Sequence, residues 1–139
     1  MVRWAGEGEL VPVLLLRAAL PDVTVRASIP DNLLSHLPLV VVRRVTGSSP
    51  APRFWDGVSI NVQCWSDAVD DRDPVAAASD LADQARKALW EAWDNQTVTA
   101  SGHIAQLRES QGPMEVIDPD LPHLGRYVAT YALRVRSAA

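Results

Sequence analysis

Four aspartates lie close together in one short stretch of the chain, and they are the first candidates for chemistry. They are Asp67, Asp70, Asp71 and Asp73. A calcium-binding loop needs acids at alternate positions, a central glycine and a terminal bidentate acid, and this stretch lacks that spacing. A two-carboxylate hydrolase needs a partner acid or base across a cleft, which a single stretch does not supply. Because Asp73 precedes Pro74, a combination typical of a helix start, we interpret the cluster as a strand-to-helix junction with solvated acids.

The other residues with chemical potential show no arrangement typical of a site. His36, His103 and His123 are far apart and have no zinc-ligand spacing. Cys64 is the one cysteine, so it forms no internal disulfide, and it falls on the apolar side of an alternating segment, where a small buried hydrophobe is expected. The sequence contains neither a glycine-rich phosphate loop after a strand nor a Gly-x-Ser-x-Gly elbow. We therefore expect no catalytic residue, no metal site and no cofactor.

Composition is that of a globular protein and sets limits on its partners. The chain has 139 residues, which suits a single domain spanning residues 1–139. Its 13 basic and 17 acidic residues give a net charge of −4, which argues against a dedicated nucleic-acid binder. Two local basic patches exist. Arg43 and Arg44 are adjacent, and Arg134 and Arg136 are two residues apart, so they would lie on the same face of a strand. We interpret both patches as solvated strand faces. The apolar run Val11–Leu16 is too short to span a bilayer, so we expect no membrane partner.

The elements that would position these residues follow from hydrophobic periodicity. Period-two alternation predicts strands, and its clearest case places Val58, Ile60, Val62 and Cys64 on one face and Trp65 on the opposite, polar face. The predicted strands cover residues 23–29, 39–45, 58–65, 102–109 and 126–136, with Gly112 and Pro113 interrupting the fourth and residues 47–57 forming a loop.

Helical spacing appears in two segments. Residues 74–93 carry an alanine-rich apolar stripe, and a shorter helix is expected near residues 10–18, with Pro12 in its first turn. The order of elements shows no regular βαβ alternation. The predicted fold class is therefore α+β, a mostly antiparallel β-sheet with one long and one short helix packed on it.

Five tryptophans in so small a chain indicate contact surfaces, because tryptophan and arginine are enriched in protein–protein interfaces. Several occupy positions where burial is not obvious. Phe54 and Trp55 fall in the predicted loop, and Trp65 falls on the polar side of its strand.

Most of the chain resembles a known family. The matching segments are EGELVPVLLLRAALPDVTV, LPLVVVRRVTG, VSINVQCWSD followed by DPVAAASDLADQARKALWEA, and GRYVATYALRVR. They resemble the tail terminator, or tail completion, proteins of long-tailed, siphovirus-type bacteriophages, especially those of actinobacterial phages. The resemblance implies a structural protein of the virion tail or neck, present in the host cytoplasm during assembly, and not an enzyme.

The resemblance also implies partners. Such proteins form a ring of identical subunits, usually a hexamer, that caps the tail tube and presents a surface to the head connector or stopper protein. DNA passes through the lumen without specific binding.

A ring requires two different patches on each subunit. The two sheet edges, or a helix and a loop, are natural patches, because an exposed edge otherwise invites uncontrolled pairing. We predict that Arg53, Phe54, Trp55 and Trp65 contact a neighbouring subunit or the tube, since a long loop without internal structure is often a binding element.

Other functions predict different structures. A head–tail stopper would be more β-barrel-like, and an adaptor would be mostly helical. A small α+β enzyme or ligand-binding domain would show a sizeable apolar pocket with converging polar groups and perturbed pKa values. A host regulatory domain would bind a small ligand as a dimer.

Overall fold

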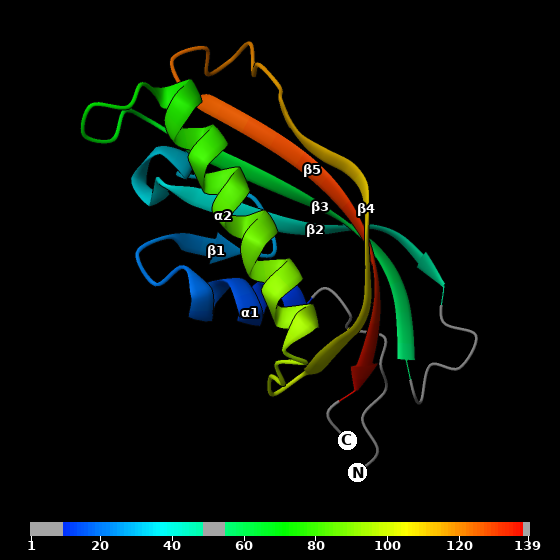
Figure 1. Cartoon of the computed structure of the whole chain (residues 1–139). Coiled ribbons are helices and arrows are strands. Elements are labelled where there is room, and N and C mark those ends of the chain that lie inside the picture. The colour runs from blue at the N-terminus through cyan, green and yellow to red at the C-terminus, as the bar shows by residue number, and fades with distance from the viewer. Residues whose placement is uncertain (1–9, 49–54, 138–139) are drawn as a thin grey trace.

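The computed structural model describes residues 10–48 and 55–137 of the chain, and it has the predicted fold class (Figure 1). A five-stranded sheet with strand order β1-β2-β3-β5-β4 carries one long and one short helix. In chain order the elements are α1 (Leu10–Ala19), β1 (Thr24–Arg26), the 3-10 helix η1 (Leu33–His36), β2 (Leu39–Ser48), β3 (Trp55–Ser66), α2 (Pro74–Asp94), β4 (Gly102–Glu115) and β5 (Gly125–Ser137). No helix in these two ranges has the length and apolarity needed to cross a membrane.

The sheet is antiparallel except at one edge, where β1 pairs in parallel with β2. The predicted strand over residues 23–29 is too long, because β1 ends at Arg26 and Ile29 is exposed. A parallel neighbour needs a return connection of about a dozen residues, so the chain must leave the sheet early to begin it. That return contains η1.

The long helix begins as predicted at the aspartate cluster. The Asp73 side chain accepts a hydrogen bond of 2.8 Å from the Ala76 N–H, and Pro74 occupies the first helical turn. The start of the helix lies directly on the start of β5. A Cβ on Gly125 would come within 1.9 Å of the Pro74 carbonyl oxygen, so only glycine allows this approach.

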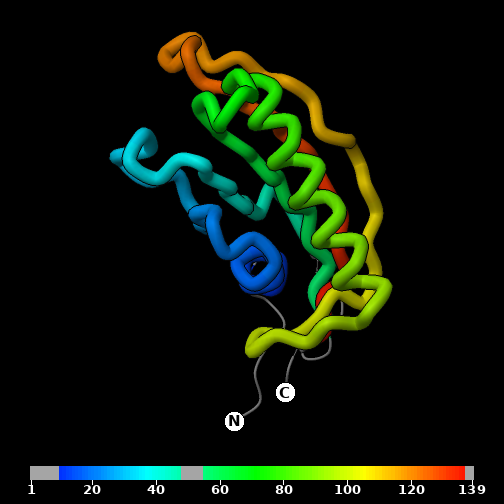
Figure 2. Tube along the Cα trace, turned by 60° about the vertical axis from the view of Figure 1, so that its left-hand side comes forward, coloured from blue at the N-terminus to red at the C-terminus, as the bar shows by residue number. Residues whose placement is uncertain are grey.

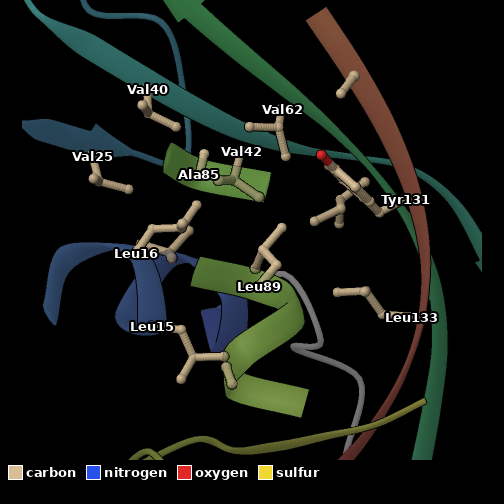
Figure 3. Close-up of a cluster of buried hydrophobic side chains, with 14 of the residues drawn as sticks. Leu15, Leu16, Val25, Val40, Val42, Val62, Ala85, Leu89, Tyr131 and Leu133 are labelled. Atoms are coloured by element: carbon tan, nitrogen blue, oxygen red, sulfur yellow. The ribbon is translucent and has the colours of Figure 1, made fainter. Parts of the chain in front are cut away.

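Both helices pack on the same face of the sheet, and the main core lies between them and the strands (Figures 2 and 3). Leu16 of α1 and Leu89 of α2 are fully buried there together with Val42 and Tyr131 of the sheet. The buried stripe of α2 is mostly alanine, and these small side chains let the helix lie close to the strands. It consists of Ala77, Ala78, Leu81, Ala82, Ala85, Leu89 and Ala92.

The fourth predicted strand does not end where glycine and proline occur. β4 continues through Gly112 and Pro113 to Glu115, with register shifts between Ile104 and Gln106 and on both sides of Gln111. The prediction was wrong because β4 is an edge strand. An edge strand tolerates proline, whose missing N–H can face away from the ladder, and it absorbs extra residues as bulges.

The loop predicted over residues 47–57 is too long at both ends. Gly47 pairs with Val58 and Ser48 with Gly57, so β2 extends further, and Trp55 already belongs to β3. Pairing of β3 with β5 continues to this point and keeps the chain extended. Residues 49–54, which include Arg53 and Phe54, lie outside the described part of the chain.

Candidate subunit interface

The face of the sheet opposite the helices is here called the open face. Within residues 10–48 and 55–137, the segments that cover it lie at one end only. At that end η1 and the loop of residues 116–124 fold over the strands and enclose a second apolar cluster. Its buried members are Leu39, Val41, Trp65 and Leu124, with Leu33, Leu37 and Leu121 packed against them. Towards the β2–β3 hairpin, no part of residues 10–48 or 55–137 covers the open face with a helix (Figure 1).

Trp65 lies in the covered end. The prediction placed it on the polar side of its strand, and the side is correct, but only 2% of the residue is exposed. The expectation of a surface position is therefore wrong, because η1 and the 116–124 loop bury that side of the strand. The Arg126 guanidinium lies 4.9 Å from the ring centroid and donates a hydrogen bond of 3.0 Å to Gln63 Oε1. A side chain so buried offers almost no area to a neighbouring molecule.

Trp55 lies at the other end of the same face. It is half-buried, and the Arg134 guanidinium lies 4.4 Å from its ring centroid. Trp55 pairs with Arg136 across the sheet, so both exposed arginines of β5 stand beside this ring. Trp55 therefore remains a predicted contact residue, now placed on a strand instead of a loop.

A buried ion pair holds the base of the hairpin and was not predicted. The Asp56 side chain is fully buried and accepts two hydrogen bonds, 2.7 Å from Arg44 Nη1 and 3.2 Å from Nη2. This two-pronged geometry fixes the direction of both strands next to Trp55. Parity places both side chains on the helix side of the sheet, but their meeting depends on the register of β2 against β3, which composition does not reveal.

The open face is hollowed where its side chains are small. A hollow of about 290 Å³ is bounded by Trp55, Arg108 and Arg134 and has Gly57 and Ala132 on its floor. A neighbouring hollow of about 320 Å³ continues over Gly57 and Ala132 towards β2. Such a surface can receive protruding side chains of a partner.

Two side chains with raised pKa values, Cys64 and Tyr131, lie in the main core. Burial raises the pKa of the Cys64 thiol to about 12, and burial is also the main reason that the pKa of Tyr131 is raised. Both side chains belong to the main core, and neither lines the hollows of the open face or the hollow of about 170 Å³ between Leu81 and Pro38. The features expected of a ligand-binding domain are thus not found together in these places.

The aspartates of residues 67–73 and the three histidines, for which the sequence predicted no catalytic or metal role, are exposed or half-buried in the structure. Asp67, Asp70 and Asp71 are exposed, and within residues 10–48 and 55–137 no three His, Cys, Asp or Glu side chains form a group that could hold a metal ion. His36 bonds only locally, with Nε2 lying 3.1 Å from Asn32 Oδ1.

A family model described as "Phage tail termination protein" matches residues 7–136. The chain belongs to this family. The predicted resemblance is thereby confirmed, and the protein is a structural protein of the phage tail. No curated protein matches the chain. Among solved structures, a chain of "Virion of native gene transfer agent (GTA) particle" has a TM-score of 0.46 and 16% identity, with 97% of this chain and all of that chain covered.

The sheet edges of this tail termination protein are partly occupied by its own side chains. At the β4 edge, Trp93 Nε1 donates a hydrogen bond of 3.1 Å to the carbonyl of Ala105. At the β1 edge, Arg17 Nε donates one of 3.0 Å to the carbonyl of Val25. Strand addition by a partner requires free backbone groups at an edge. The open face is therefore a better candidate for subunit contacts than either edge at these points.

Proposed function

We propose that copies of this protein assemble into a homohexameric ring that caps the tail tube, ends its growth and presents a surface to the head connector or stopper protein. Each subunit contributes one domain, and DNA passes through the lumen without specific binding. The ring belongs to the tail or neck of the virion and is built in the host cytoplasm. Membership of the tail termination family supports the proposal.

The observation that carries the proposal is the uncovered end of the open face. It combines a half-buried tryptophan, Trp55, with the exposed Arg134, and these are the residue types that dominate binding energy at interfaces. The hollow over Gly57 and Ala132 provides the concave surface, and the Arg44–Asp56 pair holds it rigid. Little ordering is then needed on association, which favours binding.

The architecture also separates the terminator from the other neck proteins. A stopper would be β-barrel-like and an adaptor mostly helical. Here the sheet is open, with β1 and β4 at its two edges, and a 21-residue helix crosses it. This arrangement favours the terminator over both alternatives.

The test is assembly of a Phe54→Ser, Trp55→Ser double variant, measured by size-exclusion chromatography with light scattering and by electron microscopy. The wild type is expected to form rings with a central hole, alone or on tail tubes, and the variant to remain a folded monomer. The control is Val98→Ser, since Val98 is 69% exposed and lies away from the open face.

Two results would contradict the proposal in different ways. Rings of unchanged stability in the double variant would remove Trp55 from the interface. A wild type that forms no ring, even when mixed with tail tubes, would overturn the ring itself.

A further inference from the structure

Positive charge is concentrated on the open face. Besides Arg26 of β1, which pairs with Val41, five arginines of β2, β4 and β5 lie there by register, because each pairs with a residue on that face. The pairs are Arg43 with Asn61, Arg108 with Ala132, Arg126 with Trp65, Arg134 with Gly57, and Arg136 with Trp55. All but Arg126 are exposed.

The acids of the strands lie on the opposite face. Asp56 pairs with Val135 and Glu115 with Tyr127, and both partners belong to the helix-covered core, as does Tyr131, the partner of Glu109. Within the described ranges, no strand acid therefore lies on the open face, and none of these five arginines forms an ion pair. The face is positively charged although the whole chain carries a net charge of −4.

Two of these arginines are held in fixed positions. Arg126 lies over the ring of Trp65 and Arg134 over the ring of Trp55, with guanidinium-to-centroid distances of 4.9 and 4.4 Å. Arg126 lies at the covered end, where it already donates to Gln63 and its Nε is buried. The exposed Arg134 keeps its planar set of donors available and loses less freedom on binding a carboxylate. The open face is thus prepared for an anionic partner.

The same chain carries a matching anionic surface at its other end. Asp67, Asp70 and Asp71 are exposed in the β3–α2 junction, and Asp120 is exposed in the 116–124 loop. Both loops lie at the end of the sheet away from the β2–β3 hairpin (Figures 1 and 2). Here these two loops are called the acidic end.

We propose that the open face of one copy docks against the acidic end of the next copy. This inference rests on the ring proposed above and names its contact. The two surfaces differ, so the contact is head-to-tail and propagates around a ring. A second copy is favoured over duplex DNA because each chain supplies its own complementary charge, whereas a chain of net charge −4 repels phosphate at a distance.

The test uses two charge-reversal variants. One carries Arg43→Glu, Arg108→Glu and Arg136→Glu on the open face, and the other carries Asp67→Lys, Asp71→Lys and Asp120→Lys at the acidic end, so that each changes three of the four exposed charges of its surface. None of these six side chains forms an ion pair or caps a helix in the described ranges, so the monomer is expected to fold. Like charges then meet at every contact of a ring built from one variant. The affinity between subunits is therefore expected to fall roughly tenfold or more in each variant alone.

Mixing the two variants gives the sharper result. In an alternating ring every contact again joins opposite charges, so an equimolar mixture is expected to recover rings that contain both variants. Rising salt should weaken wild-type and mixed rings together. The control is Gln84→Glu with Lys87→Glu, two exposed positions on α2 outside both surfaces, which should assemble like the wild type. Circular dichroism verifies folding in each case.

Three outcomes would overturn the inference while leaving the ring intact. The first is normal assembly of both variants. The second is failure of both variants without recovery on mixing. The third is normal rings of the open-face variant together with lost binding to a labelled DNA duplex, which would assign the face to DNA. A wild type that forms no ring, with or without tail tubes, instead contradicts the proposed function.

Discussion

Trp55 and Trp65 lie on the same strand and the same face of the sheet, and each is stacked against an arginine of β5. Their surroundings nevertheless differ. Trp65 is 2% exposed beneath η1 and the 116–124 loop, while Trp55 is half-buried on a surface hollowed by Gly57. The alternation of a strand sets the face of a side chain, and segments distant in the sequence decide whether that face is covered. The covered end contributes to folding, and the other end is the one proposed above to contact partners.

The largest expected difference between the two ends comes from truncating the tryptophans. Trp65→Ala should lower the free energy of unfolding by about 3–5 kcal/mol, because it leaves a cavity in a closed cluster. Trp55→Ala should cost about 1 kcal/mol or less, as for most surface changes. Urea denaturation followed by circular dichroism measures both. Equal losses would show that the two ends are equally packed.

Removing the cover should have the next largest effect. Leu124 is 7% exposed and packs in the cluster with Trp65. Leu124→Ala is expected to lower the free energy of unfolding by about 2–4 kcal/mol. Val98→Ala, at a position that is 69% exposed, should change it by no more than about 0.5 kcal/mol. A negligible loss at Leu124 would mean that the loop covers Trp65 without stabilising it.

The open end has its own internal anchor, and breaking it should have a moderate effect. Asp56→Asn removes the charge that faces Arg44 and should cost about 2 kcal/mol, below the usual range for a fully buried pair because the Arg44 side chain is 31% exposed. Asp120→Asn, at an exposed position, is the matched control. Thermal unfolding would detect the difference, and identical midpoints for the two variants would contradict a stabilising role of the pair.

The smallest expected effects come from the stacked arginines. Arg126→Gln should lower the free energy of unfolding by about 1 kcal/mol, since it loses both the ring contact and the bond to Gln63. Arg134→Gln should cost about 0.5 kcal/mol, as expected for an exposed contact. Denaturation curves with well-determined slopes are needed to resolve values of this size. If Arg134→Gln instead cost more stability than Arg126→Gln, Arg134 would have to be regarded chiefly as a residue that stabilises the fold and not as part of a docking surface.

The features that were predicted correctly depend on residues close together in the chain. They are the helix start at Asp73 and Pro74 and the choice of which alternate side chains of β3 and β5 share a face of the sheet. The errors lie where distant segments meet. The burial of Trp65 depends on Leu37 and Leu121, and no periodicity within β3 reveals them.

The candidate interface was predicted only in part. Trp55 and the parity shared by Arg134 and Arg136 were visible in the sequence, but their meeting on one face depends on the register of β3 against β5. The pair of Arg44 and Asp56 was missed for the same reason. The contact roles of Arg53, Phe54 and Trp55 stay predictions.

The hydrogen bonds from Trp93 and Arg17 to carbonyls on the outer strands also bear on unwanted aggregation of the protein. An unfolded stretch of another chain could bond at these points only after displacing a donor already in place. At these two points the edges are less open to the strand addition by which chains stack into fibrils of indefinite length. A member of a family that terminates the phage tail thus has edge contacts that oppose the growth of a different polymer, the fibril.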